Sequence, residues 1–494
     1  MTSTASPPAS SGAPTTQTAA GGSLLLYVAL GGLAFAVLQS LVAPALPILA
    51  RELDASVADT SWVLTAYLLS ASVLTPILGR LGDIVGKRKA LIGVLVVLAI
   101  GTLLAALAPG LGVLIVARVL QGASGAIMPL SIGMIRDEMP HDKVSVSVGI
   151  VSAIAGIGAG VGIVAAGPIV EHLSWHWLFW LPLVLVVIAL AGAVFAMKES
   201  PVRAPGRLDL VGAAVLTVSL LALLLAISKG QAWGWSDGKT VGLLALGVVA
   251  LAALVAVESR VREPLIDMRL LRQRGVWTTD LVGLILGFAM FGTFLLIPTL
   301  LQLPESTGFG FGKSVSAAGL FLLPTVLMLI VFGVVGGILV RRFGPKVPLV
   351  VGALCVALGF LLPAIDHAAL WQVLASGVLV GIGLGLAFSA MSNAIILAVP
   401  AAQTGVAIGV NNVARTVGSS VGTAVIAAVL ASSVTSQGIA TNGAFTAAFW
   451  TCTGAALLAV LAALALPSAL ARGAVDAPGT GAAPDRVPAG AGGH

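Results

Sequence analysis

The sequence predicts an all-α membrane protein with fourteen transmembrane helices, arranged as two six-helix halves with two extra helices inserted between them. Of its 494 residues, 58% are hydrophobic and only 9% are charged, whereas a soluble domain has about 25% charged residues. The apolar residues form fourteen runs of roughly the 20 residues that cross a bilayer. A charged, glycine-rich segment after the second run recurs after the tenth, which is the offset expected if the seventh and eighth runs are an insertion between parallel repeats.

The predicted spans follow one another closely. They cover about residues 24–49, 61–78, 90–108, 112–135, 145–168, 178–197, 209–228, 241–257, 278–301, 315–340, 347–365, 372–396, 403–431 and 445–466. The two ends of the chain are rich in small residues and proline, which is typical of disorder. We therefore expect a disordered cytoplasmic tail (1–22), an N-terminal six-helix bundle (23–200), two inserted helices with a cytoplasmic linker (201–275), a C-terminal six-helix bundle (276–466) and a second disordered cytoplasmic tail (467–494).

The distribution of cations predicts the orientation. With both termini in the cytoplasm, 19 of the 25 Lys and Arg residues fall on the inner side, and the outer loops hold only Arg51, Lys229, Lys239 and Lys313. This asymmetry satisfies the positive-inside rule, so the net charge of +6 indicates cationic loops rather than nucleic-acid binding. The two cysteines lie inside apolar runs, and we expect no disulfide, metal site or cofactor.

The most distinctive segment is GRLGDIVGKRK, from Gly79 to Lys89. A segment this charged is expected to form a tight loop at the membrane surface, with Gly79 and Gly86 allowing a sharp turn and close approach of a neighbouring helix. Asp83, its only acid, is suited to meet the positive N-terminus of another helix or a guanidinium. The simpler interpretation is a cationic anchor without a gating role.

The spacing of this segment resembles the loop between the second and third helices of major facilitator superfamily transporters, where the loop acts as a cytoplasmic gate. Ile84 replaces the usual arginine of the family, so an ion pair within the segment would use Lys87 or Arg88. The stretch 337–346, GILVRRFGPK, repeats the spacing and has Arg341 in the place of the acid.

A buried arginine is the first candidate for a transport residue. Arg118 lies about 10 Å inside the fourth span, where an arginine costs about 2.5 to 3.5 kcal/mol and should face the bundle interior. Leu114, Arg118, Gln121 and Gly122 resemble a family pattern in which the arginine is linked to proton coupling. The alternative is a structural arginine bound to backbone carbonyls.

The fifth span resembles the antiporter motif of the family. Gly158, Gly162 and Gly167 match it, but Ile163 replaces a proline that normally kinks the helix. Glu171, which follows the motif near the outer mouth, is a candidate for proton coupling.

Trp62 and Tyr67 resemble the start of the second span in the fourteen-helix drug:proton antiporters, while Leu38 replaces their usual first-span Asp. Asp280, about 3 Å from the cytoplasmic end of its span, is a second coupling candidate. Arg415 is deep in the thirteenth span, and such cations usually line a polar cavity or bond a neighbouring helix. The cavity candidates are Gln39, Trp62, Tyr67, Asn411, Asn412 and Arg415.

The resemblance implies a monomeric secondary transporter in the cytoplasmic membrane of a bacterium. It would export amphipathic or lipophilic small molecules by alternating access, with the proton gradient as its energy source. One alternative is a dedicated exporter of one lipid or secondary metabolite that need not be coupled to protons. A membrane enzyme should show a polar catalytic cluster at the interface, and none is evident; a receptor or scaffold would give no flux.

Overall fold

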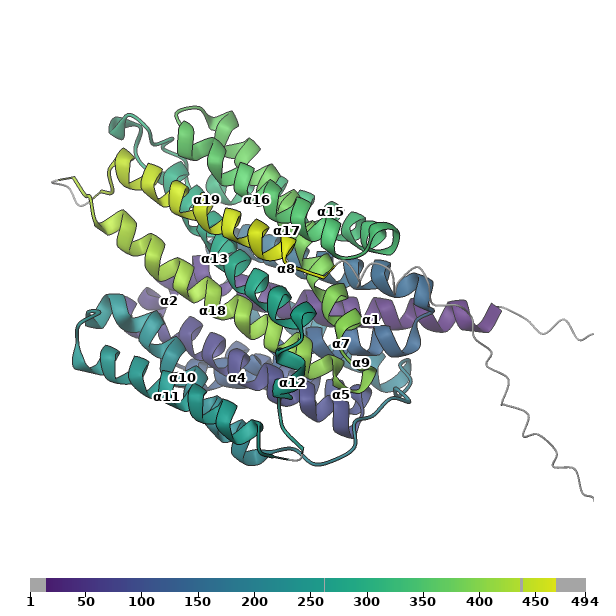
Figure 1. Cartoon of the computed structure of the whole chain (residues 1–494). Coiled ribbons are helices and arrows are strands. Elements are labelled where there is room, and N and C mark those ends of the chain that lie inside the picture. Colours follow the sequence, from purple (N-terminus) through teal and green to yellow (C-terminus); the bar gives the residue numbers. More distant parts are fainter. Residues whose placement is uncertain (1–14, 262, 436–438, 468–494) are drawn as a thin grey trace, which may run out of the picture.

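The structure is a computed structural model that describes residues 15–261, 263–435 and 439–467 (Figure 1), and these residues are almost entirely helical. The first helices are α1 (Thr15–Ser40), α2 (Val42–Glu52), α3 (Val57–Thr60), α4 (Trp62–Val85), α5 (Lys87–Ala106), α6 (Leu111–Gln121), η1 (Gly122–Ala126), α7 (Ile127–Glu138), α8 (His141–His172) and α9 (Trp177–Phe195). The next are α10 (Leu210–Trp233), α11 (Gly238–Glu258), α12 (Met268–Leu271), α13 (Arg274–Gln302), η2 (Glu305–Thr307) and α14 (Val315–Phe321). The last are α15 (Leu323–Phe343), α16 (Lys346–Ile365), α17 (Leu370–Ala398), η3 (Ala401–Gln403), α18 (Thr404–Ala431) and α19 (Asn442–Leu464).

The described part of the chain contains twelve helices long and apolar enough to cross a membrane, and thirteen if α1 and α2 form one span bent by 46°. The predicted multi-pass, all-helical architecture is therefore confirmed at that level. Helix α8 is 32 residues long and occupies the place of the predicted fifth span, although several of its side chains lie outside the described residues. Helix α1 begins at Thr15, so residues 15–22 of the predicted tail are helical.

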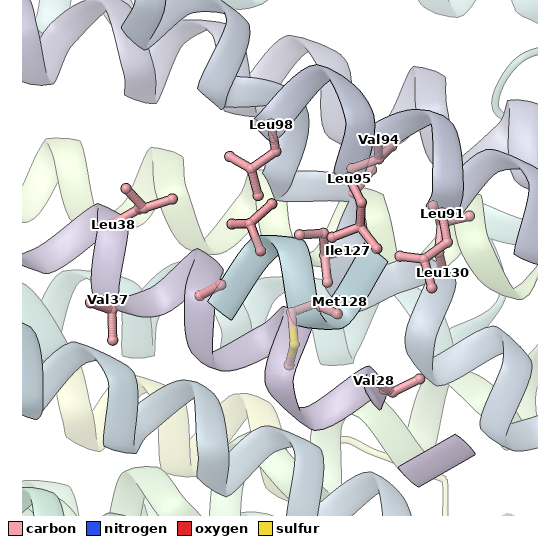
Figure 2. Close-up of a cluster of buried hydrophobic side chains, with 14 of the residues drawn as sticks. Val28, Val37, Leu38, Leu91, Val94, Leu95, Leu98, Ile127, Met128 and Leu130 are labelled. Carbon is pink, nitrogen blue, oxygen red and sulfur yellow. The ribbon is translucent and has the colours of Figure 1, made fainter. Parts of the chain in front are cut away.

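Buried apolar side chains join the helices that precede residue 200. Figure 2 shows part of this cluster, in which side chains of α5 such as Leu91 and Leu98 lie toward Ile127 and Leu130 of α7, while Leu38 of α1 lies at the left of the view. These five side chains are at most 1% exposed. Because lipid is as apolar as a leucine side chain, the gain from this packing is mainly van der Waals contact rather than removal of water.

A second apolar cluster is formed by α13, α15, α16, α17 and α19. Glycines let its helices approach at the level of the backbone. A methyl group added at Gly352 of α16 would lie 2.6 Å from the carbonyl oxygen of Gly383 in α17. Such small-residue contacts are how membrane helices pack most closely.

Helices α10 and α11 lie side by side at the edge of the molecule, and α10 packs against α4 and α18 (Figure 1). Only 22% of the apolar window of α11 is buried, so most of this helix faces lipid. The linker after α11 packs against the protein through its apolar side chains. Leu265 and Ile266 are buried against α10, α4 and α18, because these helices offer the linker an apolar surface within the protein.

Two further expectations about local structure were wrong. The charged segment 79–89 is not a loop, because α4 continues to Val85, Gly86 alone makes the turn with φ of 113°, and α5 begins at Lys87. The charged groups avoid hydrocarbon by packing against other helices, so no surface loop is required. Lys229 lies in α10, rather than in an outer loop, and is 8% exposed.

Candidate functional site

The carboxylate of Asp83, on α4, lies at the N-terminus of α18, which is more than 300 residues later in the sequence. The backbone N–H groups of Gly405 and Val406 donate to Asp83 Oδ1 and Oδ2 at 3.2 and 3.1 Å. Asp83 is fully buried, and the positive end of the helix dipole favours its negative charge. A helix N-terminus is one of the two partners that the sequence suggested for this acid.

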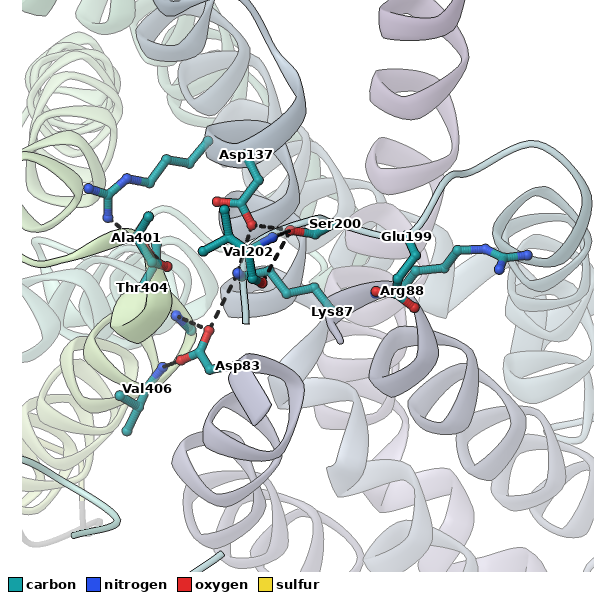
Figure 3. Close-up of polar contacts among 12 residues, drawn as sticks. Asp83, Lys87, Arg88, Asp137, Glu199, Ser200, Val202, Ala401, Thr404 and Val406 are labelled. Carbon is teal, nitrogen blue, oxygen red and sulfur yellow. Dashed lines mark hydrogen bonds and ion pairs between the residues drawn. The ribbon is translucent and has the colours of Figure 1, made fainter. Parts of the chain in front are cut away.

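Lys87 connects this contact to a second acid (Figure 3). Its Nζ lies 3.7 Å from Asp83 Oδ1 and 2.7 Å from Asp137 Oδ2, and all three side chains are fully buried. The hydroxyl of Ser200 also donates to Asp137. The ion pair within the segment thus uses Lys87, whereas Arg88 donates to the backbone carbonyl oxygens of α9 at 2.9 and 2.6 Å.

A second polar contact joins the two parts of the bundle beside Asp83. Arg136, near the end of α7, donates from Nη1 to Thr404 Oγ1 at 2.6 Å and from Nη2 to the carbonyl oxygen of Val399 at 2.8 Å. This residue was not singled out from the sequence, because an arginine at the end of a span reads as a positive-inside cation. Its role in the interface depends on where α17 and α18 lie.

Glycines bring backbones together at the same end of the molecule. A methyl group added at Gly79 of α4 would lie 2.8 Å from the carbonyl oxygen of Gly405, and one at Gly149 of α8 would lie 2.6 Å from that of Gly333 in α15. Gly337, the counterpart of Gly79 in the sequence repeat, packs against the backbone of Ser145. The two copies of the repeated segment therefore make backbone contact with α18 and α8, and the predicted cytoplasmic end is closely packed.

Arg118 is fully buried and bonded to three neighbours. Its Nε donates to the carbonyl oxygen of Val63 at 3.0 Å, and its Nη1 donates to that of Leu38 at 3.2 Å and to Gln121 Oε1 at 2.7 Å. The guanidinium carbon lies 4.2 Å from the centroid of the Tyr67 ring. Nη2 is buried and has no hydrogen-bond partner among the described residues. The structure thus shows the backbone bonds of a structural arginine and leaves one donor unused.

The polar residues of α13 and α18 form two separate contacts. Asn411 Nδ2 donates to Asp280 Oδ1 at 3.0 Å. Arg415 Nη2 donates to Asn412 Oδ1 at 3.1 Å, and its guanidinium carbon lies 4.7 Å from the Phe388 ring centroid. Asp280 is therefore bonded to a neighbouring helix, and Arg415 is not paired with an acid in the part of the chain described.

The glycines of the fifth span pack against the first helix. Gly158 would bring an added methyl group to 2.9 Å from the carbonyl oxygen of Leu33, and Gly162 packs against Ser40. Ser40 Oγ donates to the carbonyl oxygen of Gly158 at 3.1 Å. Gly167 is half-buried, and the side chain of Glu171 lies outside the described residues.

Of the remaining cavity candidates, Gln39 is half-buried, and Trp62 lies beside a cation that was not expected there. The Nζ of Lys229 is 4.6 Å from the Trp62 ring centroid and donates to Ser61 Oγ at 2.8 Å. Gln231, two residues after Lys229 in α10, donates to the carbonyl oxygen of Ala424 at 3.2 Å. Helix α10 therefore bonds both α4 and α18.

No group of three or more His, Cys, Asp or Glu side chains within the described ranges could hold a metal ion. The arrangement consists instead of buried charged and polar groups that link helices to one another. Such an arrangement can hold helices in one packing and release them when the charges change, but it offers no nucleophile activated by a base.

Known proteins resemble this chain in sequence and fold. The model of the Major Facilitator Superfamily matches residues 28–423, with a second match over residues 282–488. The tetracenomycin C resistance and export protein of Streptomyces glaucescens is 32% identical over 397 residues, which cover 78% of this chain and 71% of that protein. The cephamycin export protein of Amycolatopsis lactamdurans is also 32% identical, over 74% of this chain and 76% of that protein. A crystal structure of a human organic anion transporter matches with a TM-score of 0.61 and 15% identity, covering 91% of this chain and 99% of that one.

Proposed function

The chain belongs to the major facilitator superfamily of secondary transporters, and we propose that it exports amphipathic, lipophilic small molecules across the cytoplasmic membrane by proton antiport. The observation that carries this proposal is the buried contact between Asp83 and the N-terminus of α18. It joins helices that are more than 300 residues apart in sequence at one end of the bundle, as a gate for alternating access requires. Relatives named as exporters of tetracenomycin C and cephamycin support the outward direction.

The proposed architecture has fourteen spans, with α1 and α2 as the first and α8 as the fifth. Two six-helix halves (23–200 and 276–466) flank the inserted segment (201–275), both termini lie in the cytoplasm, and the protein acts as a monomer. On this arrangement the gate is the cytoplasmic one, and the structure corresponds to a state closed to the cytoplasm.

Charge in the interior favours neutral or anionic substrates. Arg118 and Arg415 are deep in their helices, whereas Asp83 and Asp280 lie near the predicted inner face and Leu38 occupies the place of the first-span acid. A dication entering such an interior would give up hydration without a matching counter-charge, which costs several kcal/mol.

Coupling would run through acids outside the centre of the bundle, because arginine does not titrate in the useful range. The candidates are Glu171, Asp280 and, through the gate, Asp83, with Gln121 holding Arg118 in place. A dedicated exporter of one secondary metabolite is the second candidate, and it is favoured by the names of the same relatives.

The test is transport in proteoliposomes that contain the full chain. We expect a proton gradient to drive movement of neutral or anionic lipophilic dyes, and substrate to drive proton movement that falls in Glu171→Gln, in Asp280→Asn and further in the double variant. Efficient transport of a dication would contradict the charge argument, and full coupling in the double variant would contradict these coupling residues. Absence of any flux across a broad panel of dyes and metabolites would contradict export itself.

A further inference from the structure

Two acidic side chains meet at the base of the inserted helices, outside both six-helix halves. Asp209 caps α10, with its Oδ1 accepting the backbone N–H groups of Val211 and Gly212 at 3.0 and 2.9 Å. Glu258, the last residue of α11, is only 2% exposed, and its Oε2 accepts the backbone N–H of Ile266 at 3.2 Å. Each carboxylate therefore uses one oxygen to hold local structure.

The other two oxygens face the same small space. Glu258 Oε1 and Asp209 Oδ2 are both buried and have no hydrogen-bond partner within the described ranges. A methyl group added at Gly212 would collide with Glu258 Oε1 and would lie 2.8 Å from Asp209 Oδ2. Two carboxylates whose facing oxygens are buried repel each other when both are ionised, and the cost is removed when one of them holds a proton.

The surroundings indicate which acid holds the proton. The N-terminus of α10 stabilises negative charge on Asp209, so the proton belongs on Glu258, whose Oε1 can then donate to Asp209 Oδ2. A metal ion is a poorer occupant, because a third acidic, His or Cys ligand is missing among the described residues and a guanidinium lies close by.

That guanidinium is Arg80 of α4, which is 7% exposed and whose buried Nε has no hydrogen-bond partner in the part of the chain described. The other acids of the linker are engaged elsewhere. Glu263 accepts the backbone N–H of Arg207 at 2.9 Å, and Asp267 accepts a backbone N–H at the start of α12 at 2.8 Å. Arg262 lies outside the described residues.

Arg80 connects the acid pair to the gate. It follows Ile77, which packs in the apolar cluster with the linker, by three residues and precedes Asp83 by three on the same helix. Its charge therefore acts on both Asp83 and Glu258. When Glu258 is protonated, the positive charge of Arg80 stabilises mainly the Asp83 carboxylate at the N-terminus of α18. When Glu258 loses its proton, the acid pair carries two negative charges and attracts Arg80 away from the gate.

We propose that Glu258 and Asp209 form a proton-binding site on the inserted helices, and that a proton bound there keeps the gate at Asp83 closed through Arg80. The proposal rests on the proposed function, in which this gate faces the cytoplasm. It supplies a route from proton binding to gating that needs no acid in the centre of the bundle.

The experiment uses the full chain in lipid nanodiscs, with two readouts that do not require transport. The first is the protonated carboxyl band in infrared difference spectra recorded against pH. The second is alkylation of a thiol at Ser389→Cys, a fully buried position packed against Gly149, in a variant without the two native cysteines. The alkylation rate at each pH is divided by the rate measured for the same thiol in the unfolded protein at that pH.

For the parent protein we expect the alkylation rate to rise about tenfold as pH increases through the titration of the acid pair. One pKa unit of coupling between this titration and gate opening corresponds to a factor of ten in the opening equilibrium. Glu258→Gln should remove the infrared band and stay slow at every pH. Asp209→Asn should move the midpoint to lower pH, because the amide can still cap α10 and can donate to ionised Glu258. Arg80→Gln should keep the band but lose the pH dependence of alkylation. Glu263→Gln, an exposed acid of the same linker, is the matched control and should behave as the parent.

An infrared band and pH profile unchanged in Glu258→Gln would overturn the proton site. If Glu258→Gln does not fold, an unchanged midpoint of the carboxyl titration in Asp209→Asn would overturn the proton site. A pH profile unchanged in Arg80→Gln would overturn the link to the gate. Dye flux in proteoliposomes separates this proposal from the proposed function, since loss of flux with an intact titration would contradict export and leave the proton site standing.

Discussion

Replacing Asp83 with Asn should open the gate without unfolding the protein. The substitution removes the negative charge that faces the N-terminus of α18, while one side-chain oxygen can still accept an N–H from Gly405 or Val406. Lys87 keeps its 2.7 Å contact with Asp137, so no buried cation is left unpaired. The loss is thus mainly the interaction of a charge with a helix terminus, which reaches about 2 kcal/mol in a partly buried geometry.

A loss of 1 to 2 kcal/mol changes the ratio of closed to open molecules by a factor of about 5 to 30. The assay is alkylation of the Ser389→Cys thiol in a background with Cys355 and Cys452 replaced by Ala, and the rate should rise by about that factor in Asp83→Asn. Asp142→Asn, which changes an exposed acid in the first turn of α8, is the matched control. An unchanged rate in Asp83→Asn, with a melting temperature close to that of the parent, would refute the gating role of this acid.

Three further predictions test the packing, the buried arginine and the topology. Gly405→Ala should raise the alkylation rate of the Ser389→Cys thiol, because the added methyl group would lie 2.8 Å from a carbonyl oxygen of α4. Gly443→Ala, where the nearest atom is 3.9 Å away, is the control and should leave the rate unchanged. Equal rates in the two variants would contradict the close contact at Gly405. Arg118→Lys should lower the melting temperature, since each hydrogen bond lost from a charged donor costs about 1.5 to 3 kcal/mol, and an unchanged value would argue against a structural role. Single cysteines at Pro205 and Ser236 should label from opposite faces of the membrane, and labelling from one face would remove α10 and α11 as spans.

Sequence patterns predicted the positions of most long helices, because apolar runs and charged breaks are local properties. The gate segment shows where this fails. Its charge suggested a loop, but Asp83 and Lys87 are fully buried and lie in helices, since partners from distant parts of the chain satisfy them. The spacing of Gly79 and Asp83 nevertheless indicated a close approach to another helix, and the structure contains that approach.

Other parts of the site could not be predicted from the sequence. Arg136 and Lys229 were counted as loop cations, although both contact residues far along the chain. The pairing of Asp209 with Glu258 requires α10 and α11 to pack side by side, and nothing in either local pattern reports that packing. The sequence did identify Arg118 as buried, because a single arginine in an apolar run is costly unless it has partners.

The position of α10 shields one side of the bundle, where α4 and α18 meet, from the lipid and leaves the side where α8 and α15 meet without that shield. Near one side, Lys229 and Gln231 bind α10 to α4 and α18, and the apolar side chains of α10 pack along the line where these two helices meet. A lipid tail, or a lipophilic molecule dissolved among the tails, is kept from that line. On the other side α8 and α15 meet without such a cover from α10 or α11 among the described helices. A molecule that approached the interior sideways from a leaflet, instead of from the water, would therefore meet less protein where α8 and α15 meet than where α4 and α18 meet.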